Sequence, residues 1–227
     1  MSLIENKKAV FFDLFDTLVS VGWVKEYPDT AFSLGIDRED WNRLLLDQSP
    51  ERLSGQMTDP VEIMRSLAHT FDPGIPMNLI REVTATRIRR FERALAIVPR
   101  ETIEQLTRLR SHGIKIGLIS NADVAETTGW PRSPLAPLFD TVVFSCEVGY
   151  VKPDPAIYHI GLKQLGVEAC EALFVGDGGS SEHKGARETG LTPVLYTGIT
   201  KDTWPQRIEQ CRKQVDHVIE DFAALYS

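Results

Sequence analysis

The hydrophobic positions of this chain form short continuous runs, each followed by polar residues and then by a stretch with helical spacing. The runs predict six strands, over residues 9–12, 114–119, 141–145, 172–176, 193–196 and 217–219. Unbroken apolar runs of this length are typical of parallel strands buried on both faces. Between them, Arg100–His112 carries its apolar residues on one face and ends at Gly113, a helix C-cap. Asp154 and Pro155 begin a further helix that ends at Gly166. This alternation predicts βαβ units with right-handed crossovers.

Residues 21–96 follow a different pattern, with helical spacing and no convincing strand. Three helices are predicted there, over Asp37–Asp47, Thr58–Phe71 and Pro76–Leu95. The last of them has an apolar stripe at three-to-four spacing. Four arginines crowd the same helix and are expected on its solvated face: Arg87, Arg89, Arg90 and Arg93. We therefore predict a core built from residues 1–20 and 97–227, with an all-helical insertion over 21–96.

Polar signatures follow four of the predicted strands at their carboxyl ends. They are Asp13-Leu14-Phe15-Asp16-Thr17-Leu18, Ser120-Asn121, Lys152-Pro153-Asp154-Pro155, and Gly176-Asp177-Gly178-Gly179 with Glu182. Ligands of open parallel sheets bind at the carboxyl ends of the strands. Since all four signatures fall there, they predict a single site with the acids, hydroxyls and lysine of phosphoryl-transfer chemistry.

Composition narrows the class of protein. The chain has 227 residues, 42% hydrophobic and 25% charged, with a net charge of −7. This negative net charge argues against nucleic acid as the main partner, because a phosphate backbone attracts clustered positive charge. No apolar run approaches the roughly 18 residues of a membrane span, and no signal-peptide pattern opens the chain. Its three widely spaced cysteines, Cys146, Cys170 and Cys211, predict reduced thiols in a cytoplasmic protein. From the charge and the apolar runs, neither a membrane nor nucleic acid is expected as a partner. The oligomeric state is left open.

The four signatures, in this order and each behind a strand, resemble the motifs of the haloacid dehalogenase-like hydrolase superfamily. The resemblance covers nearly the whole chain and points to the branch with a helical cap inserted after the first motif. It implies an α/β fold, a Rossmann-like parallel sheet core with an inserted all-helical cap. It also implies a hydrolase, most often a phosphatase that acts on a small phosphorylated metabolite through an aspartyl-phosphate.

The resemblance assigns roles to the residues that match its motifs. Asp13 stands in the position of the nucleophile, and Lys152 in that of the cation that neutralises the transferring group. Ser120 matches the phosphate-binding hydroxyl, and Asn121 is expected to add an amide donor to the substrate. Thr17 is expected to take part in catalysis with these residues. Alternatively, it only caps the turn after the first strand.

The matching ligands of Mg²⁺ are all oxygen atoms. They are the carboxylates of Asp13 and Asp177, the backbone carbonyl of Phe15, and Glu182 as a ligand or as a support for one. Magnesium binds through a few carboxylates and keeps several waters. The expected cofactor is therefore Mg²⁺.

One position departs from the phosphatase pattern. These enzymes usually carry an aspartate two residues after the nucleophile, and this aspartate protonates the leaving group. This chain has Phe15 at that position, and its nearest acid, Asp16, lies one residue further along. Three hypotheses remain open. The first is a Mg²⁺-dependent phosphatase that is restricted to good leaving groups or uses an acid from the cap. The others are a 2-haloacid dehalogenase-like hydrolase and a non-catalytic protein that binds a phosphate ligand. Arg38 and Arg43 lie where a dehalogenase places its halide-binding arginine. Trp23 and Lys25 are expected to face the opening under the cap.

Overall fold

The computed structural model describes residues 2–47, 49–201 and 204–227. These residues contain a six-stranded, fully parallel sheet with the order β3-β2-β1-β4-β5-β6. The strands are β1 (Ala9–Phe12), β2 (Lys115–Ser120), β3 (Thr141–Phe144), β4 (Ala172–Gly176), β5 (Thr192–Tyr196) and β6 (His217–Ile219). Each boundary lies within one residue of its prediction, so the α/β fold class is confirmed.

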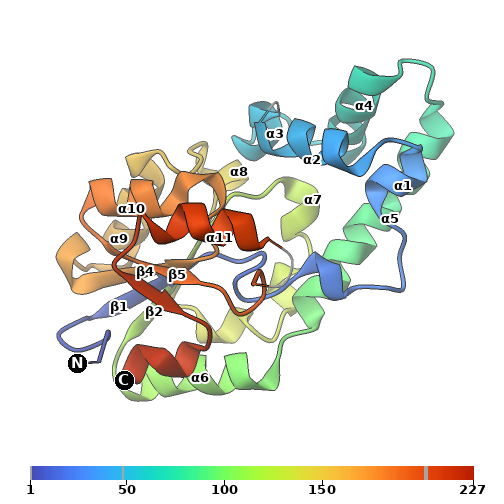
Figure 1. The fold of residues 1–227 in the computed structure, drawn as a ribbon. Coiled ribbons are helices and arrows are strands. Elements are labelled where there is room, and N and C mark those ends of the chain that lie inside the picture. Colours follow the sequence, from blue (N-terminus) through green and yellow to red (C-terminus); the bar gives the residue numbers. More distant parts are fainter. Residues whose placement is uncertain (1, 48, 202–203) are drawn as a thin grey trace.

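Helices cover both faces of this sheet (Figure 1). They are α6 (Arg100–Ser111), α9 (Pro155–Leu165), α10 (Glu182–Thr189) and α11 (Pro205–Arg212). Alternate residues of β1 point to opposite faces. Phe12 packs in one cluster with Leu106 of α6, whereas Phe11 packs in another with Tyr158 of α9. Because both faces of β1 are buried, all four of its residues are apolar.

Short elements complete the core. They are α7 (Val124–Thr127), α8 (Ser145–Val148) and the 3-10 turns η1 (Val21–Trp23), η2 (Trp130–Arg132), η3 (Ala136–Leu138), η4 (Ala169–Glu171), η5 (Gly179–Ser181) and η6 (Phe222–Tyr226). The backbone N–H of Ile4 donates to the carbonyl of Leu225 at 3.3 Å. The two ends of the chain therefore meet at the end of the molecule opposite the cap (Figure 1).

The insertion between β1 and β2 is helical, as predicted. Its helices are α1 (Thr30–Leu34), α2 (Arg38–Asp47), α3 (Pro50–Leu53), α4 (Pro60–Phe71) and α5 (Met77–Ala96). They enclose their own hydrophobic cluster, with Trp41, Met64 and Ile80 among its buried members. The three longer helices are those predicted. The short α1 and α3 were missed because four or five residues show no periodicity; instead the side chain of Asp29 caps α1.

Helix α5 belongs to both parts of the molecule. Ile80 and Val83, near its start, pack in the cap cluster, whereas Leu95, near its end, packs with Trp130 against the sheet. The helix runs without a break from cap to core (Figure 1). The predicted boundaries at residues 21 and 96 therefore stay a prediction.

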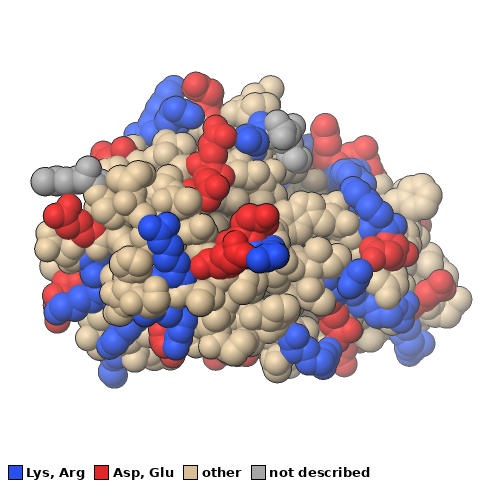
Figure 2. Space-filling view, turned by 90° about the horizontal axis from the view of Figure 1, so that it is seen from below, with Lys and Arg blue, Asp and Glu red and all other residues tan. Residues whose placement is uncertain are grey.

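None of the helices in the described residues is both long and apolar enough to cross a membrane. On the face shown in Figure 2, basic side chains are interspersed with acidic ones rather than gathered into one basic surface. The exclusion of nucleic acid as a partner stays a prediction.

Candidate active site

The signatures of β1, β2 and β4 meet because these strands are neighbours in the sheet. Phe12, the last residue of β1, is in register with Leu118 of β2 and Val175 of β4. Asp13 follows directly, and its backbone N–H donates to the carbonyl of Val175 at 2.9 Å. Ser120 and Asp177 lie at the corresponding ends of β2 and β4. The parallel register therefore brings an acid, a hydroxyl and a second acid to one edge.

Lys152 enters this edge from the loop between α8 and α9. Its Nζ lies 2.6 Å from Asp13 Oδ1 and 2.6 Å from Glu182 Oε2, and its side chain is only 2% exposed. Burial opposes the charge on this ammonium, but the carboxylates of Asp13 and Glu182 outweigh it and raise the pKa of Lys152. Lys152 is therefore a fixed positive charge beside Asp13.

Asn121 holds the backbone of this lysine. Its Oδ1 accepts from the Lys152 N–H at 2.7 Å, and its Nδ2 donates to the Lys152 carbonyl at 3.1 Å. We expected the amide to contact substrate, but the contacts in the structure position Lys152. Direct contact between Asn121 and substrate stays a prediction.

Three buried acids converge next to Lys152. One oxygen each of Asp13, Asp177 and Glu182 lies within 4.8 Å of the others. Backbone N–H groups orient two of them: Gly178 donates to Glu182 Oε1 at 2.8 Å, and Gly179 to Asp177 Oδ1 at 3.1 Å. A Cβ at Gly176 would lie 2.1 Å from Glu182 Oε1, so any larger residue there would displace this carboxylate. The loop therefore holds an oxygen-only set of ligands in a fixed arrangement.

This set of acids fits a divalent cation. Three carboxylates face one ammonium, so the buried group carries an excess of negative charge when all are ionised. Burial raises the pKa of Glu182 to about 8, with Lys152 opposing the shift and the charges of Asp13 and Asp177 reinforcing it. Oxygen ligands of this kind suit Mg²⁺. The carbonyl of Phe15, the remaining predicted ligand, stays a prediction.

Two buried hydroxyls, those of Thr17 and Ser120, belong to the same site as Asp13. Thr17 is buried, and its Oγ1 donates to Asp13 Oδ2 at 3.1 Å. Ser120 is buried at the end of β2 and lines the cavity above Asp13. The structure thus brings Thr17 into contact with the candidate nucleophile. The contact of Ser120 with a phosphate oxygen stays a prediction.

Two adjoining cavities lie at this edge. The inner cavity, of about 170 Å³, contains the carboxylates and Lys152. The outer cavity, of about 410 Å³, is lined by residues of the cap and of the core. Four residues line both cavities: Phe15, Asp16, Asn121 and Ser180. A substrate with its reacting group beside Asp13 would therefore extend into the outer cavity, past Phe15.

Comparison with known proteins shows the family of this chain. A family model described as haloacid dehalogenase-like hydrolase matches residues 7–190. The chain belongs to this family. The match includes all four motifs, and the chain is therefore a hydrolase of this family.

The relatives of this hydrolase include named phosphatases. It is 28% identical to a glyceraldehyde 3-phosphate phosphatase of Methanocaldococcus jannaschii over 86% of the chain and 87% of that protein. Two solved structures share the fold. A dehalogenase with an intermediate complex has a TM-score of 0.67 at 20% identity, over 97% of this chain and 96% of that one. A family member of Bacteroides thetaiotaomicron, in complex with magnesium and inorganic phosphate, has a TM-score of 0.61 at 18% identity, over 83% and 93%.

A buried arginine–carboxylate cluster joins the cap of this hydrolase to the core, and the sequence did not predict it. Arg87 donates to both oxygens of Asp123 at 3.0 and 3.2 Å and to Glu126 Oε1 at 2.6 Å. Arg52 donates to the same two acids at 3.0 and 3.4 Å. Asp123 also caps α7, three residues beyond Ser120. The cluster therefore connects α3 and α5 of the cap to the segment that carries Ser120 and Asn121.

The expectation that Arg87 is solvated is wrong, since only 5% of its side chain is exposed. Its charge is buried because Asp123 and Glu126 pair with it. Arg89 and Arg93 are exposed, as expected, while Arg90 is 15% exposed and pairs with Asp29.

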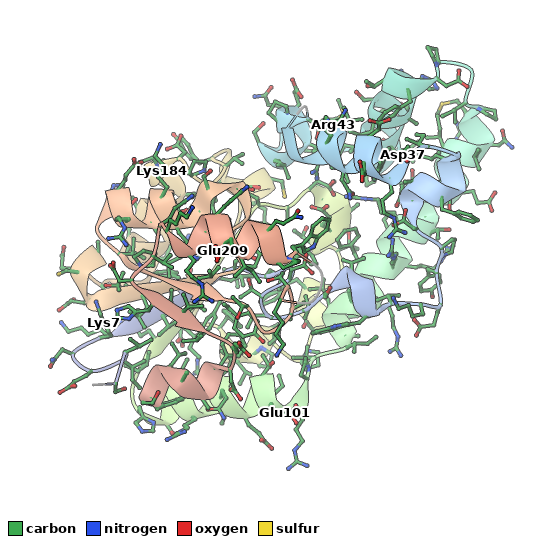
Figure 3. The ribbon with its side chains drawn as sticks, viewed as in Figure 1. Lys7, Asp37, Arg43, Glu101, Lys184 and Glu209 are labelled. Atoms are coloured by element: carbon green, nitrogen blue, oxygen red, sulfur yellow. The ribbon has the colours of Figure 1, made fainter. Side chains whose placement is uncertain are left out.

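Four other candidates are also located by the structure. Arg38 lines the outer cavity, whereas Arg43 lies on α2 (Figure 3) and pairs with Asp40. Trp23 lines a separate hollow with Pro99 and Tyr196. The expectation that Trp23 and Lys25 face the opening under the cap is therefore not supported, because neither lines the inner or the outer cavity.

Proposed function

We propose that this hydrolase is a Mg²⁺-dependent phosphatase in which Asp13 forms an aspartyl-phosphate with a small phosphorylated substrate. The observation that carries this proposal is the position of Lys152. It pairs with the candidate nucleophile Asp13 and with Glu182, one of three acids that can hold a metal. A lysine and a cation site on either side of one carboxylate suit the attack of an anion on a phosphate.

The reaction would proceed in two steps at Asp13. In the first, a carboxylate oxygen bonds to phosphorus while the bond to the leaving oxygen breaks. In the second, water attacks phosphorus, which releases phosphate and regenerates the carboxylate. Lys152 neutralises the charge on the transferring group, and Thr17 holds the other oxygen of Asp13. Ser120 would donate to a phosphate oxygen.

The metal would bind to Asp13, Asp177 and Glu182, with the carbonyl of Phe15 as a further ligand. When bound, Mg²⁺ would neutralise the negative charge of the carboxylates and the phosphate. Asp177 and Glu182 are oriented by the N–H groups of Gly179 and Gly178 before any ligand arrives. Preorganised ligands of this kind lower the cost of binding.

Phe15 restricts the leaving group in this scheme. Its ring packs edge-on against Phe91, with centroids 5.1 Å apart, and offers no proton where phosphatases of the family carry an acid. An alkoxide leaves poorly without a proton, whereas a phenolate or carboxylate is a stabilised anion. We therefore propose that aryl and acyl phosphates react much faster than alkyl phosphates.

The relatives support a phosphorylated small molecule as the substrate. One is named glyceraldehyde 3-phosphate phosphatase and another ribulose-1,5-bisphosphate 5-phosphatase. The three cysteines, all within the described residues, are free thiols. This agrees with the proposed cytoplasmic location.

A panel of aryl, acyl and alkyl phosphates and 2-haloacids, assayed with Mg²⁺ and with excess chelator, tests the proposal. We expect phosphate release that requires the metal and is lost in Asp13→Asn. Turnover of a 2-haloacid in chelator would support the dehalogenase hypothesis instead. Tight phosphate binding without turnover of any ester would indicate a binding protein.

A further inference from the structure

The outer cavity has a chemical character that selects among phosphate esters, if the proposed function holds. It adjoins the inner cavity, since Phe15 and Asp16 line both. The group attached to a phosphate beside Asp13 would therefore occupy it. The polarity and charge of the residues that line the outer cavity therefore indicate which leaving group fits there.

Apolar and aromatic side chains form much of the lining. Six come from both sides of the cap–core junction: Phe15, Leu45, Leu53, Phe91, Ile199 and Trp204. The rings of Phe15 and Phe91 meet edge to face, at an interplanar angle of 82°. Aromatic surfaces of this kind favour a flat, apolar ligand group.

The charged side chains of the outer cavity provide no net positive charge for a second anion. Two bases and two acids line it, so their formal charges cancel: Arg38, Arg52, Asp16 and Glu126. Arg52 is buried and paired with Asp123 and Glu126. Arg38 is 3.7 Å from Asp29. A second phosphate or a carboxylate on the substrate would lose water here without gaining an unpaired cation.

One polar atom in the lining has no partner. Thr200 is 1% exposed, and its Oγ1 has no hydrogen-bond partner among the described residues. A buried hydroxyl left in this state is costly unless a ligand or water bonds to it. Its place in the lining of the outer cavity makes the leaving group a suitable partner.

We propose that the outer cavity binds the ring of an aryl phosphate monoester that carries no second anionic group. In this assignment Phe15 and Phe91 contact the ring, and Thr200 hydrogen-bonds to a neutral polar substituent on it. Two independent arguments lead to aryl phosphates. A phenolate needs no proton to leave, which fits the absence of an acid at position 15, and an aryl ring fits the apolar lining.

Non-hydrolysable phosphonates separate binding from chemistry. Calorimetry with Mg²⁺ would compare phenylphosphonate, methylphosphonate and 4-carboxyphenylphosphonate on the wild-type protein. We expect phenylphosphonate to bind at least ten-fold more tightly than each of the other two, and Phe91→Ala to remove most of its advantage over methylphosphonate. Equal affinities for phenyl- and methylphosphonate would overturn the inference, whether or not any ester is hydrolysed. Failure of the proposed function would instead appear as phosphonate binding without ester turnover.

A second comparison tests Thr200. Thr200→Val should weaken 4-acetylphenylphosphonate about three- to ten-fold, the range of one hydrogen bond, and leave phenylphosphonate unchanged. Thr197→Val is the matched control, because its hydroxyl bonds to the carbonyl of Ile219 and does not line the outer cavity. An equal loss for both ligands, or none for either, would remove Thr200 from the site.

Discussion

Lys152 and Asp13 are 139 positions apart in the chain, yet Nζ of one lies 2.6 Å from Oδ1 of the other in a buried pair. Nζ also bonds to Glu182 at 2.6 Å. The ammonium of Lys152, which comes from a loop, thus joins the end of β1 to the start of α10. The site is assembled around this lysine, and the predictions below begin with it.

Lys152→Met should lower kcat by about 10²–10³-fold, the usual effect of removing one electrostatic contact to a developing charge. It should also lower the free energy of unfolding by about 3–5 kcal/mol, because Asp13 and Glu182 lose their buried partner. Steady-state kinetics and denaturant unfolding measure the two effects. Lys184→Met, on α10 (Figure 3), is the control, since Lys184 is exposed and outside both cavities. Equal activity in the two variants would exclude Lys152 from the reaction.

Asp177→Asn should remove the stabilisation that Mg²⁺ gives to the folded protein. A ligand that binds only the native state raises Tm, so wild-type Tm should rise with Mg²⁺ while that of the variant should hardly change. Thermal unfolding with a magnesium series measures this, and Asp216→Asn, at an exposed surface acid, is the control. A full magnesium response in Asp177→Asn would place the metal elsewhere.

Asp123→Asn and Glu126→Gln form a matched pair within the arginine–carboxylate cluster. Burial opposes the charge of Asp123, but Arg87 and Arg52 outweigh it and hold its pKa below the ordinary value. Burial, and then the charge of Asp123, raise the pKa of Glu126. Ionised Asp123 therefore stabilises the fold, whereas ionised Glu126 does not. We expect a loss of about 3 kcal/mol for Asp123→Asn and of no more than about 1 kcal/mol for Glu126→Gln.

The contribution of Asp123 also has a pH signature. A carboxyl with a lowered pKa stabilises the fold above its unfolded pKa, and this stabilisation is lost as the pH falls through the folded value. Below about pH 4, the free energy of unfolding should fall more steeply in wild type than in Asp123→Asn. Parallel acid titrations of the two proteins would contradict the role given to Asp123.

Phe15→Asp should raise the hydrolysis of alkyl phosphates by ten-fold or more, within the range of general acid catalysis. The new carboxyl would protonate the leaving alkoxide, and kcat/KM for glycerol phosphate measures the gain. Phe15→Asn is the control for lost packing against Phe91, because asparagine has nearly the size of aspartate but no acidic proton to donate. If wild type already hydrolyses alkyl and aryl phosphates equally, another residue supplies the proton. Asp16, which lines both cavities, would then be the first to test.

Much of the fold could be read from the sequence because buried parallel strands carry their signal locally. The run before Asp13 is apolar since Phe11 and Phe12 are both fully buried on opposite faces. The predicted site brought Asp13, Ser120 and Asp177 together, because neighbouring parallel strands have their carboxyl ends at the same edge of the sheet.

Contacts that depend on the cap could not be predicted in this way. Arg87 lies 36 positions from Asp123 and Arg52 lies 71 from it, and neither helix shows in its own pattern which charge will be buried. Arg87 looked like one of four solvated arginines, and only the packing of α5 beside α7 distinguishes it. The Thr200 hydroxyl, which has no hydrogen-bond partner among the described residues, likewise lines a cavity that cap and core residues form together, and no local pattern shows this.

The most direct test of the account is chemical capture of the phosphoenzyme. The protein would be mixed with an aryl phosphate and Mg²⁺, quenched in acid, digested and mapped by mass spectrometry. We expect one phosphoryl group on Asp13, which accumulates because no acid at position 15 activates water, and none in Asp13→Asn. Rapid turnover of the ester with an unmodified Asp13, or with the phosphoryl group on another residue, would contradict the account.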